Sequence, residues 1–251
     1  MQRKCITNAL TSCKAATMNK IAIIVAIIVT YRNLILKPRT YISGYDDPAN
    51  YDQNPFLQGD LTDIVTDGNV LGVWEPVSLL FRRFVSQFIP LSASNVLIIS
   101  LCLHIGNTLL IRGYAETVVR IYRPDATAQN VRLCSCFAAL LFGLHPLRTE
   151  VVAWASCQSY LLAASFSIVF VQTYPSNVSV VFFLLAVLCK AVSISVPIVL
   201  VLLDVRSDVL ESDTRICNRY YSNVTFLRSI IRHLSCFTLL LKPFECIIPT
   251  S

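Results

Sequence analysis

Charged side chains are scarce in this sequence, and their scarcity excludes an ordinary soluble domain. Asp, Glu, Lys and Arg make up 14% of the 251 residues, whereas 55% are hydrophobic. Average soluble chains carry about 25% charged residues. The apolar residues also gather in runs, which is typical of chains whose solvent is lipid. We therefore expect an all-α, polytopic transmembrane helical bundle of roughly five to seven spans, since each span needs about 20 residues.

The pattern also lacks the signs of a nucleic-acid interface and of a metal centre. The net charge is +6, but the basic residues stand in short groups beside apolar runs and do not alternate with aromatic residues. Among the ten cysteines, Cys134 and Cys136 have no second pair at zinc-ligand spacing. We expect no metal, no cofactor and no nucleic-acid partner.

A cleavable signal peptide is the third feature without support. The first apolar run, residues 21–30, follows several basic residues, as the core of a signal peptide would. No small-x-small cleavage pattern comes after it, because the next residues are Tyr31, Arg32 and Asn33. We predict instead a cytoplasmic tail of residues 1–17 and a first span over residues 18–36.

Later apolar runs complete a predicted membrane domain of residues 18–205. Three further spans are expected at residues 95–111, 133–144 and 151–171. Residues 178–205 are long for one span and short for two, so a tilted helix and a tight pair both fit. A polar loop with a weak apolar segment is expected for residues 206–251.

The arginines after the second span predict the orientation of the chain. They place the next loop in the cytoplasm by the positive-inside rule; they are Arg112, Arg120, Arg123 and Arg132. The long acidic loop of residues 37–94 is then lumenal. The sequon at Asn177 falls on the cytoplasmic side, and a second sequon begins at Asn223.

The end of the acidic loop predicts a helix over residues 76–88. Its apolar residues recur at helical spacing, and Arg82 and Arg83 fall on the opposite face. It is too short to span, so an amphipathic helix in the membrane interface fits best. A helix packed on a small soluble loop domain is the alternative.

Several polar residues are candidates for a functional site, because charged and polar side chains are costly within a membrane span. His104 and Asn107 share a helix face, where they would bind substrate or form a helix–helix contact. Lys190 would pair with a carboxylate, face a polar cavity, or merely mark a turn between two helices. Asp46 and Asp47 follow the first span, where a carboxylate could accept a proton from an attacking hydroxyl.

Taken together, these motifs resemble those of a known family. Tyr45-Asp46-Asp47-Pro48 and residues 54–62 are similar to the first lumenal loop of the transmembrane, tetratricopeptide-repeat O-mannosyltransferases. The resemblance is strongest at residues 142–154. It continues through residues 74–80, 103–110, 189–190 and 197–204, and so covers about residues 41–205.

The resemblance implies an all-helical transferase of the glycosyltransferase-C superfamily, in the endoplasmic reticulum membrane. Such enzymes move mannose from dolichyl-phosphate mannose to serine or threonine of an acceptor protein in the lumen. Asp46 and Asp47 fall on the acidic loop motif, and one of them would be the general base. Five further residues fall on family polar positions and, with Asn107, are the substrate-binding candidates: His104, His145, Arg148, Glu150 and Lys190. Arg148 or Lys190 could stabilise the phosphate leaving group.

The chain also departs from this family. Leu97 and Ser100 stand where members carry His and Asn, and residues 157–160 replace a charged cluster. The acidic neighbour of the span lysine is replaced by Ala191, and the tetratricopeptide repeats are missing. We therefore expect a truncated, diverged member, either a glycosyltransferase or a non-catalytic membrane protein on the same scaffold. A transporter is a third class, but no internal symmetry supports it.

Overall fold

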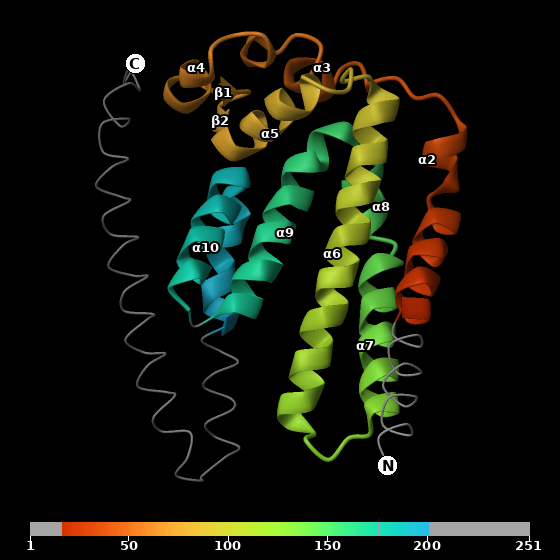
Figure 1. Ribbon diagram of the computed structural model, residues 1–251. Helices are drawn as coiled ribbons and strands as arrows, with labels where there is room; N and C mark the ends of the chain where they lie inside the picture. The colour runs from red at the N-terminus through yellow and green to blue at the C-terminus, as the bar shows by residue number, and fades with distance from the viewer. Residues whose placement is uncertain (1–16, 175, 201–251) are drawn as a thin grey trace.

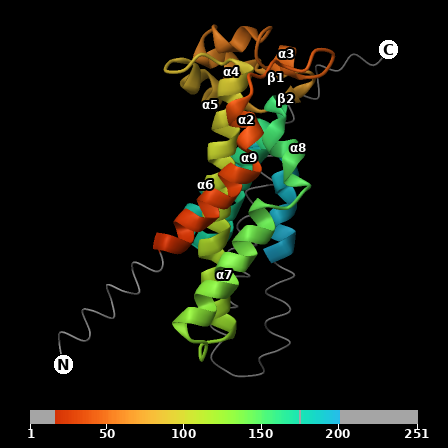
Figure 2. The ribbon, with the colours of Figure 1, turned by 90° about the vertical axis from the view of Figure 1, so that its right-hand side faces the viewer.

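The computed structural model describes residues 17–174 and 176–200, and this part of the chain is mostly helical (Figure 1). Long helices stand side by side, and residues 37–92, here called the cap, cover one end of them (Figures 1 and 2). The bundle helices are Thr17–Thr30, α2 (Arg32–Leu36), α6 (Ala93–Tyr122), α7 (Ala128–Gly143), α8 (Arg148–Ala153), η2 (Ala155–Cys157), α9 (Gln158–Thr173), α10 (Asn177–Cys189) and η3 (Ala191–Ser195).

The cap is built from short elements joined by turns. Its elements are α3 (Asp47–Asn50), η1 (Pro55–Leu57), α4 (Leu61–Thr66), β1 (Asn69–Val70), β2 (Val73–Trp74) and α5 (Pro76–Ser86). The two strands pair as an antiparallel hairpin. Its turn residues Leu71 and Gly72 both have positive φ, 54° and 79°, as a tight two-residue hairpin turn requires.

Local chemistry explains where the long helices begin and end. The hydroxyl of Ser92 accepts the Asn95 N–H at 3.4 Å, and the hydroxyl of Thr127 accepts the Asn130 N–H at 3.2 Å. These are N-caps, which satisfy amide groups that the first helical turn leaves free. Helix α6 stops at Tyr122 because Arg123 precedes Pro124, and a residue before proline avoids the helical region.

Two helices of the described part are long and apolar enough to cross a membrane. They are Ala93–Tyr122 and Ala155–Thr173, and shorter apolar helices cover Thr17–Thr30, Asn177–Cys189 and Ala191–Leu200. Helix α7 exposes Leu133, Phe137 and Leu141, each more than half exposed, at four-residue spacing along one side. The predicted helical class is confirmed, while the number of spans stays a prediction.

Several predicted boundaries differ from the structure. Helix α6, which contains the second predicted span, runs to Tyr122 and is longer than the span expected at residues 95–111. The fourth predicted span is broken, because α8 ends at Ala153 and α9 begins at Gln158. Residues 178–200 form two helices rather than one tilted helix, since Lys190 is extended between α10 and η3. Residues 1–16, 201–205 and 206–251, with the sequon at Asn223, lie outside the described residues.

The helices pack through apolar and small residues. Ile23 and Ile27 of the first helix are buried against α6 and α7, and the rings of Phe170 and Phe183 join α9 to α10 at 5.3 Å. Gly143 lets α7 approach α6 closely, because a Cβ there would lie 2.9 Å from Cγ2 of Thr108. A side chain at position 143 would therefore disturb the contact between α6 and α7.

The substitution Gly143→Ala tests this contact. We expect a loss of about 1–3 kcal/mol of stability, because the added methyl group overpacks the Thr108 side chain. The matched control is Gly106→Ala in α6, where an added Cβ meets nothing within 4 Å. The measurement is the melting temperature of the purified chain in detergent. Equal melting temperatures for the two variants would contradict the packing described here.

The substitution Asp60→Asn tests the predicted orientation. Asp60 is exposed in the cap, and the change creates a sequon with Leu61 and Thr62. In the figures the cap lies at the opposite end of the bundle from the α6–α7 turn, which carries Arg123. In endoplasmic reticulum microsomes, and in an Asn223→Gln background, we expect a glycan on this variant and none on Asn177. A glycan on Asn177 would contradict the predicted orientation, because it would place the Asn177 end of the bundle in the lumen.

Candidate active site

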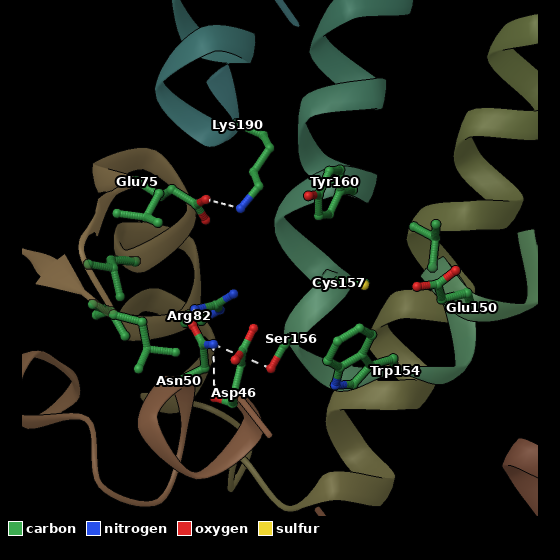
Figure 3. A pocket seen from close by; sticks show the side chains of 15 residues that line it. Asp46, Asn50, Glu75, Arg82, Glu150, Trp154, Ser156, Cys157, Tyr160 and Lys190 are labelled. Carbon is green, nitrogen blue, oxygen red and sulfur yellow. Dashed lines mark hydrogen bonds and ion pairs between the residues drawn. The ribbon is translucent and has the colours of Figure 1, made fainter. Parts of the chain in front are cut away.

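A cavity of about 370 Å³ lies where the cap meets the ends of the helices (Figure 3). Its volume falls within the roughly 300–1,000 Å³ of small-ligand sites. The cap, the α8–α9 junction and the end of α10 all contribute to its wall. The lining residues with polar or aromatic side chains are Asp46, Asn50, Glu75, Arg82, Glu150, Trp154, Ser156, Tyr160 and Lys190.

Asp47 lies behind this wall and joins the cap to the bundle. Its side chain is buried, and Oδ2 accepts the Ile42 N–H at 3.0 Å. Oδ1 accepts both the backbone N–H of Ser156 at 3.0 Å and its hydroxyl at 2.5 Å. A carboxylate whose oxygens are taken up in this way is a structural anchor rather than a base for a substrate.

Asp46 differs from its neighbour although the two are adjacent in sequence. Asp46 is exposed and lines the cavity. Within the described part of the chain, its carboxylate has no hydrogen bond and no ion pair, and it does not cap the helix that follows. Of the two aspartates, Asp46 is therefore the one placed to accept a proton inside the cavity.

Arg82 places a buried positive charge at the cavity wall. Its side chain comes from α5 and the residue is only 2% exposed. Nη1 donates to Oδ1 of Asn50 at 2.7 Å, Nη2 donates to the hydroxyl of Ser159 at 3.0 Å, and the guanidinium lies 5.0 Å from the ring centre of Tyr51. All three partners are neutral.

The charge of Arg82 is uncompensated among the residues that the structure describes. No carboxylate there lies within ion-pair distance of the guanidinium, and its buried Nε has no hydrogen-bond partner. A buried charge without a counter-ion costs several kcal/mol. The arrangement therefore favours an anion that enters the cavity from outside.

Lys190 is the second cation of the cavity, and it is neutralised. Its Nζ forms an ion pair with Oε1 of Glu75, the residue just before α5, and lies 4.8 Å from the ring centre of Tyr160. The hydroxyl of Ser78 also donates to the carbonyl of Cys189 at 3.1 Å. These contacts hold the cap against the end of α10.

Two tyrosines of the cap make hydrogen bonds through phenol groups that stay protonated, one within the cap and one to the bundle. Burial raises the pKa of Tyr41 and of Tyr51 above the ordinary value of a phenol. The hydroxyl of Tyr41 donates to the carbonyl of Leu91 at 2.5 Å, and that of Tyr51 donates to the carbonyl of Ala155 at 2.9 Å. Both groups are therefore permanent donors at neutral pH.

The structure brings only some of the predicted site residues together. Asp46, Glu150 and Lys190 line the cavity, with Asp47 directly behind it. The carboxylate of Glu150, like that of Asp46, has no hydrogen bond and no ion pair within the described residues. Glu150 comes from α8, whose position depends on the helix break that the sequence did not predict.

The remaining predicted residues lie outside the cavity. His104 is buried and its Nε2 lies 2.9 Å from the carbonyl of Gly143, while Asn107 donates to the carbonyl of Leu161 at 2.9 Å. These are the helix–helix contacts that were the alternative expectation. His145 is exposed and accepts the Leu147 N–H through Nδ1 at 3.2 Å. The guanidinium of Arg148 lies over the ring of Phe142 at 4.4 Å, beside a separate shallow hollow.

Arg82, Ser156 and Ser159 are site residues that the sequence analysis missed. Arg82 was expected on the solvent face of an amphipathic helix, but it points inward, while Phe84 and Phe88 are 64% and 71% exposed. Ser159 was read as the loss of a charge, whereas it supplies a hydroxyl to Arg82. The available signal was a charged residue, Arg82, between the aromatic residues Phe81 and Phe84 of a helix that begins at a proline.

Comparison with known proteins adds no assignment, because no protein-family model, curated protein or solved structure matches this chain. Within residues 17–174 and 176–200, no group of three or more His, Cys, Asp or Glu side chains could hold a metal ion. The chemistry of the cavity is therefore inferred from its own residues.

The different roles of the two aspartates can be tested by stability. Asp47→Asn replaces one acceptor oxygen by an amide group and removes the charge, so we expect a loss of about 1–3 kcal/mol. Asp46→Asn is the matched control and should leave the melting temperature unchanged, because its carboxylate has no partner in the described residues. The measurement is thermal unfolding in detergent. A larger loss from Asp46→Asn would contradict these roles.

Proposed function

We propose that this protein is a membrane glycosyltransferase that uses a polyprenyl-phosphate sugar. The observation that carries the proposal is that one cavity contains both the free carboxylate of Asp46 and the buried guanidinium of Arg82, which has no counter-ion among the described residues. The resemblance of residues 41–205 to the O-mannosyltransferases supports dolichyl-phosphate mannose as donor. It also supports serine or threonine of an acceptor protein as the receiving group.

The reaction requires a base and a group that stabilises the leaving phosphate. Asp46 accepts the proton of the acceptor hydroxyl while the oxygen of that hydroxyl bonds to the anomeric carbon of the sugar. The bond from that carbon to the phosphate oxygen breaks, and its electron pair leaves with the lipid phosphate. Arg82 then faces a phosphate with one more negative charge than before, which its guanidinium stabilises by charge-assisted hydrogen bonds.

The position of the cavity agrees with a lipid-linked donor. It lies at the end of a bundle that holds two helices long and apolar enough to cross a membrane. The exposed rings of Phe84 on α5 and of Phe88 just after it suit the membrane interface, where amphipathic helices turn phenylalanine side chains toward the acyl chains. A lipid anchored in the bilayer could thus present its phosphate to the cavity. The proposed location is the endoplasmic reticulum membrane, with the cap in the lumen.

A non-catalytic membrane protein on the same scaffold is the second candidate. It is favoured by neutral residues where the family carries charge: Gln158 and Ser159 are buried and contact Tyr51 and Arg82. Lys190 is also neutralised by Glu75. The two candidates differ in whether the full chain transfers sugar.

A transfer assay with the purified chain in lipid tests the proposal. With dolichyl-phosphate mannose and a serine- and threonine-containing peptide, we expect transfer by the unmodified chain. Asp46→Asn should lower the rate by on the order of 10²–10⁴-fold, since it removes the base but no structural contact. Asp52→Asn, an exposed acid of the cap that does not line the cavity, should keep the rate.

Arg82→Gln should lower the rate as well, because the cation that stabilises the leaving phosphate is lost, and the melting temperature of this variant shows whether its fold survives. An unchanged rate for Asp46→Asn would overturn the assigned base. An unmodified chain that transfers no sugar from a panel of polyprenyl-phosphate hexoses would support the non-catalytic protein instead.

A further inference from the structure

The geometry points to a subsite for a neutral sugar ring, formed by Trp154 and Glu150, on the side of the cavity away from the Glu75–Lys190 pair. This inference rests on the proposed function and deepens it: the sugar of the donor lies at one wall of the cavity and its phosphate at the opposite wall. Figure 3 shows Trp154 and Glu150 together on one side, Arg82 on the other, and Asp46 between them.

Trp154 is held in place by the local fold. It follows α8 with an extended backbone, φ −112° and ψ 120°, and its N–H donates to the carbonyl of Glu150 at 3.0 Å. Its indole meets the ring of Tyr45 edge to face, with 6.0 Å between ring centres. Its buried Nε1 has no hydrogen-bond partner within the described residues. The indole is thus a fixed aromatic wall with one unused donor.

The chemistry of this wall suits a pyranose ring. A pyranose carries C–H groups on a face and hydroxyls around its rim. The C–H groups are attracted to the negative face of an indole. A carboxylate without partners, such as that of Glu150, accepts hydrogen bonds from hydroxyls. The Nε1 donor of Trp154 could serve a ring hydroxyl as well.

Electrostatics assigns the phosphate to the opposite wall. Asp46 and Glu150 are both unpaired within residues 17–174 and 176–200, so a phosphate beside them would meet two like charges. Arg82 offers the only cation of the cavity without a carboxylate partner in that part of the chain. The anion therefore lies at Arg82, the sugar lies at Trp154 and Glu150, and the bond between them lies near Asp46. The same repulsion excludes an acidic sugar.

Binding to the full chain in nanodiscs tests the subsite without requiring turnover. The probes are dolichyl-phosphate mannose and sugar-free dolichyl phosphate, each titrated against the unmodified chain and its variants. Glu150→Gln and Trp154→Ala should each weaken binding of the sugar-loaded lipid about 10–100-fold. The first removes a charged acceptor of sugar hydroxyls, and the second removes the aromatic face against which the ring packs. Sugar-free dolichyl phosphate should keep its affinity for both variants.

Two further variants separate recognition from folding. Trp154→Phe keeps an aromatic face and should recover part of the affinity for the sugar-loaded lipid. Glu116→Gln, at a helical site outside the cavity, should leave both affinities unchanged. Equal losses for the two lipids, or no loss for either, would overturn the subsite.

The outcomes also separate this inference from the proposed function. A chain that discriminates between the two lipids through Trp154 and Glu150 but transfers no sugar would overturn the transferase and keep the subsite. A chain that transfers mannose while both variants bind the loaded lipid normally would overturn the subsite alone. Failure to bind either lipid would overturn both.

Discussion

The hydrogen bonds of the buried Asp47 carboxylate determine how the cap sits on the helices. They join the backbone at Ile42 to the backbone and hydroxyl of Ser156, which are far apart in the sequence. Asn50 in turn donates to Ser156 and accepts from Arg82. One buried acid thus organises a chain of contacts that ends at the cation of the cavity. Without it, the cap would hold the break between α8 and α9 through fewer hydrogen bonds, those of Asn50 to Ser156 and of Tyr51 to Ala155.

The charges of the cavity are distributed unevenly, and this asymmetry carries its chemistry. Glu75 pairs with Lys190, whereas Arg82 on one wall and the two acids Asp46 and Glu150 have no ionic partner within the described residues. An elongated ligand with an anionic end and a hydroxyl-rich end would complement both walls. The ion pair of Glu75 and Lys190 also lines the cavity, and it links the start of α5 to the end of α10.

Polar residues inside the bundle serve packing rather than the cavity. Asn107 connects α6 to α9 through Leu161 and Ser165, and His104 connects α6 to the end of α7. Such contacts stabilise helix association where apolar side chains gain little from leaving lipid. They explain why polarity within a span is an ambiguous sign of a binding site: both a cavity and a helix contact satisfy the same group.

The sequence by itself determined the helical class, the apolar runs and the position of α5, because these follow from composition and from local periodicity. It also indicated Asp46, Glu150 and Lys190 as candidates. Only the tertiary structure decided between Asp46 and Asp47, since the choice depends on which carboxylate meets the amide and hydroxyl of Ser156, over a hundred residues away. The inward turn of Arg82 was equally hidden, because its partners Asn50 and Ser159 come from separate elements. Periodicity reports which residues share a helix face, but the neighbours of that face are set by packing.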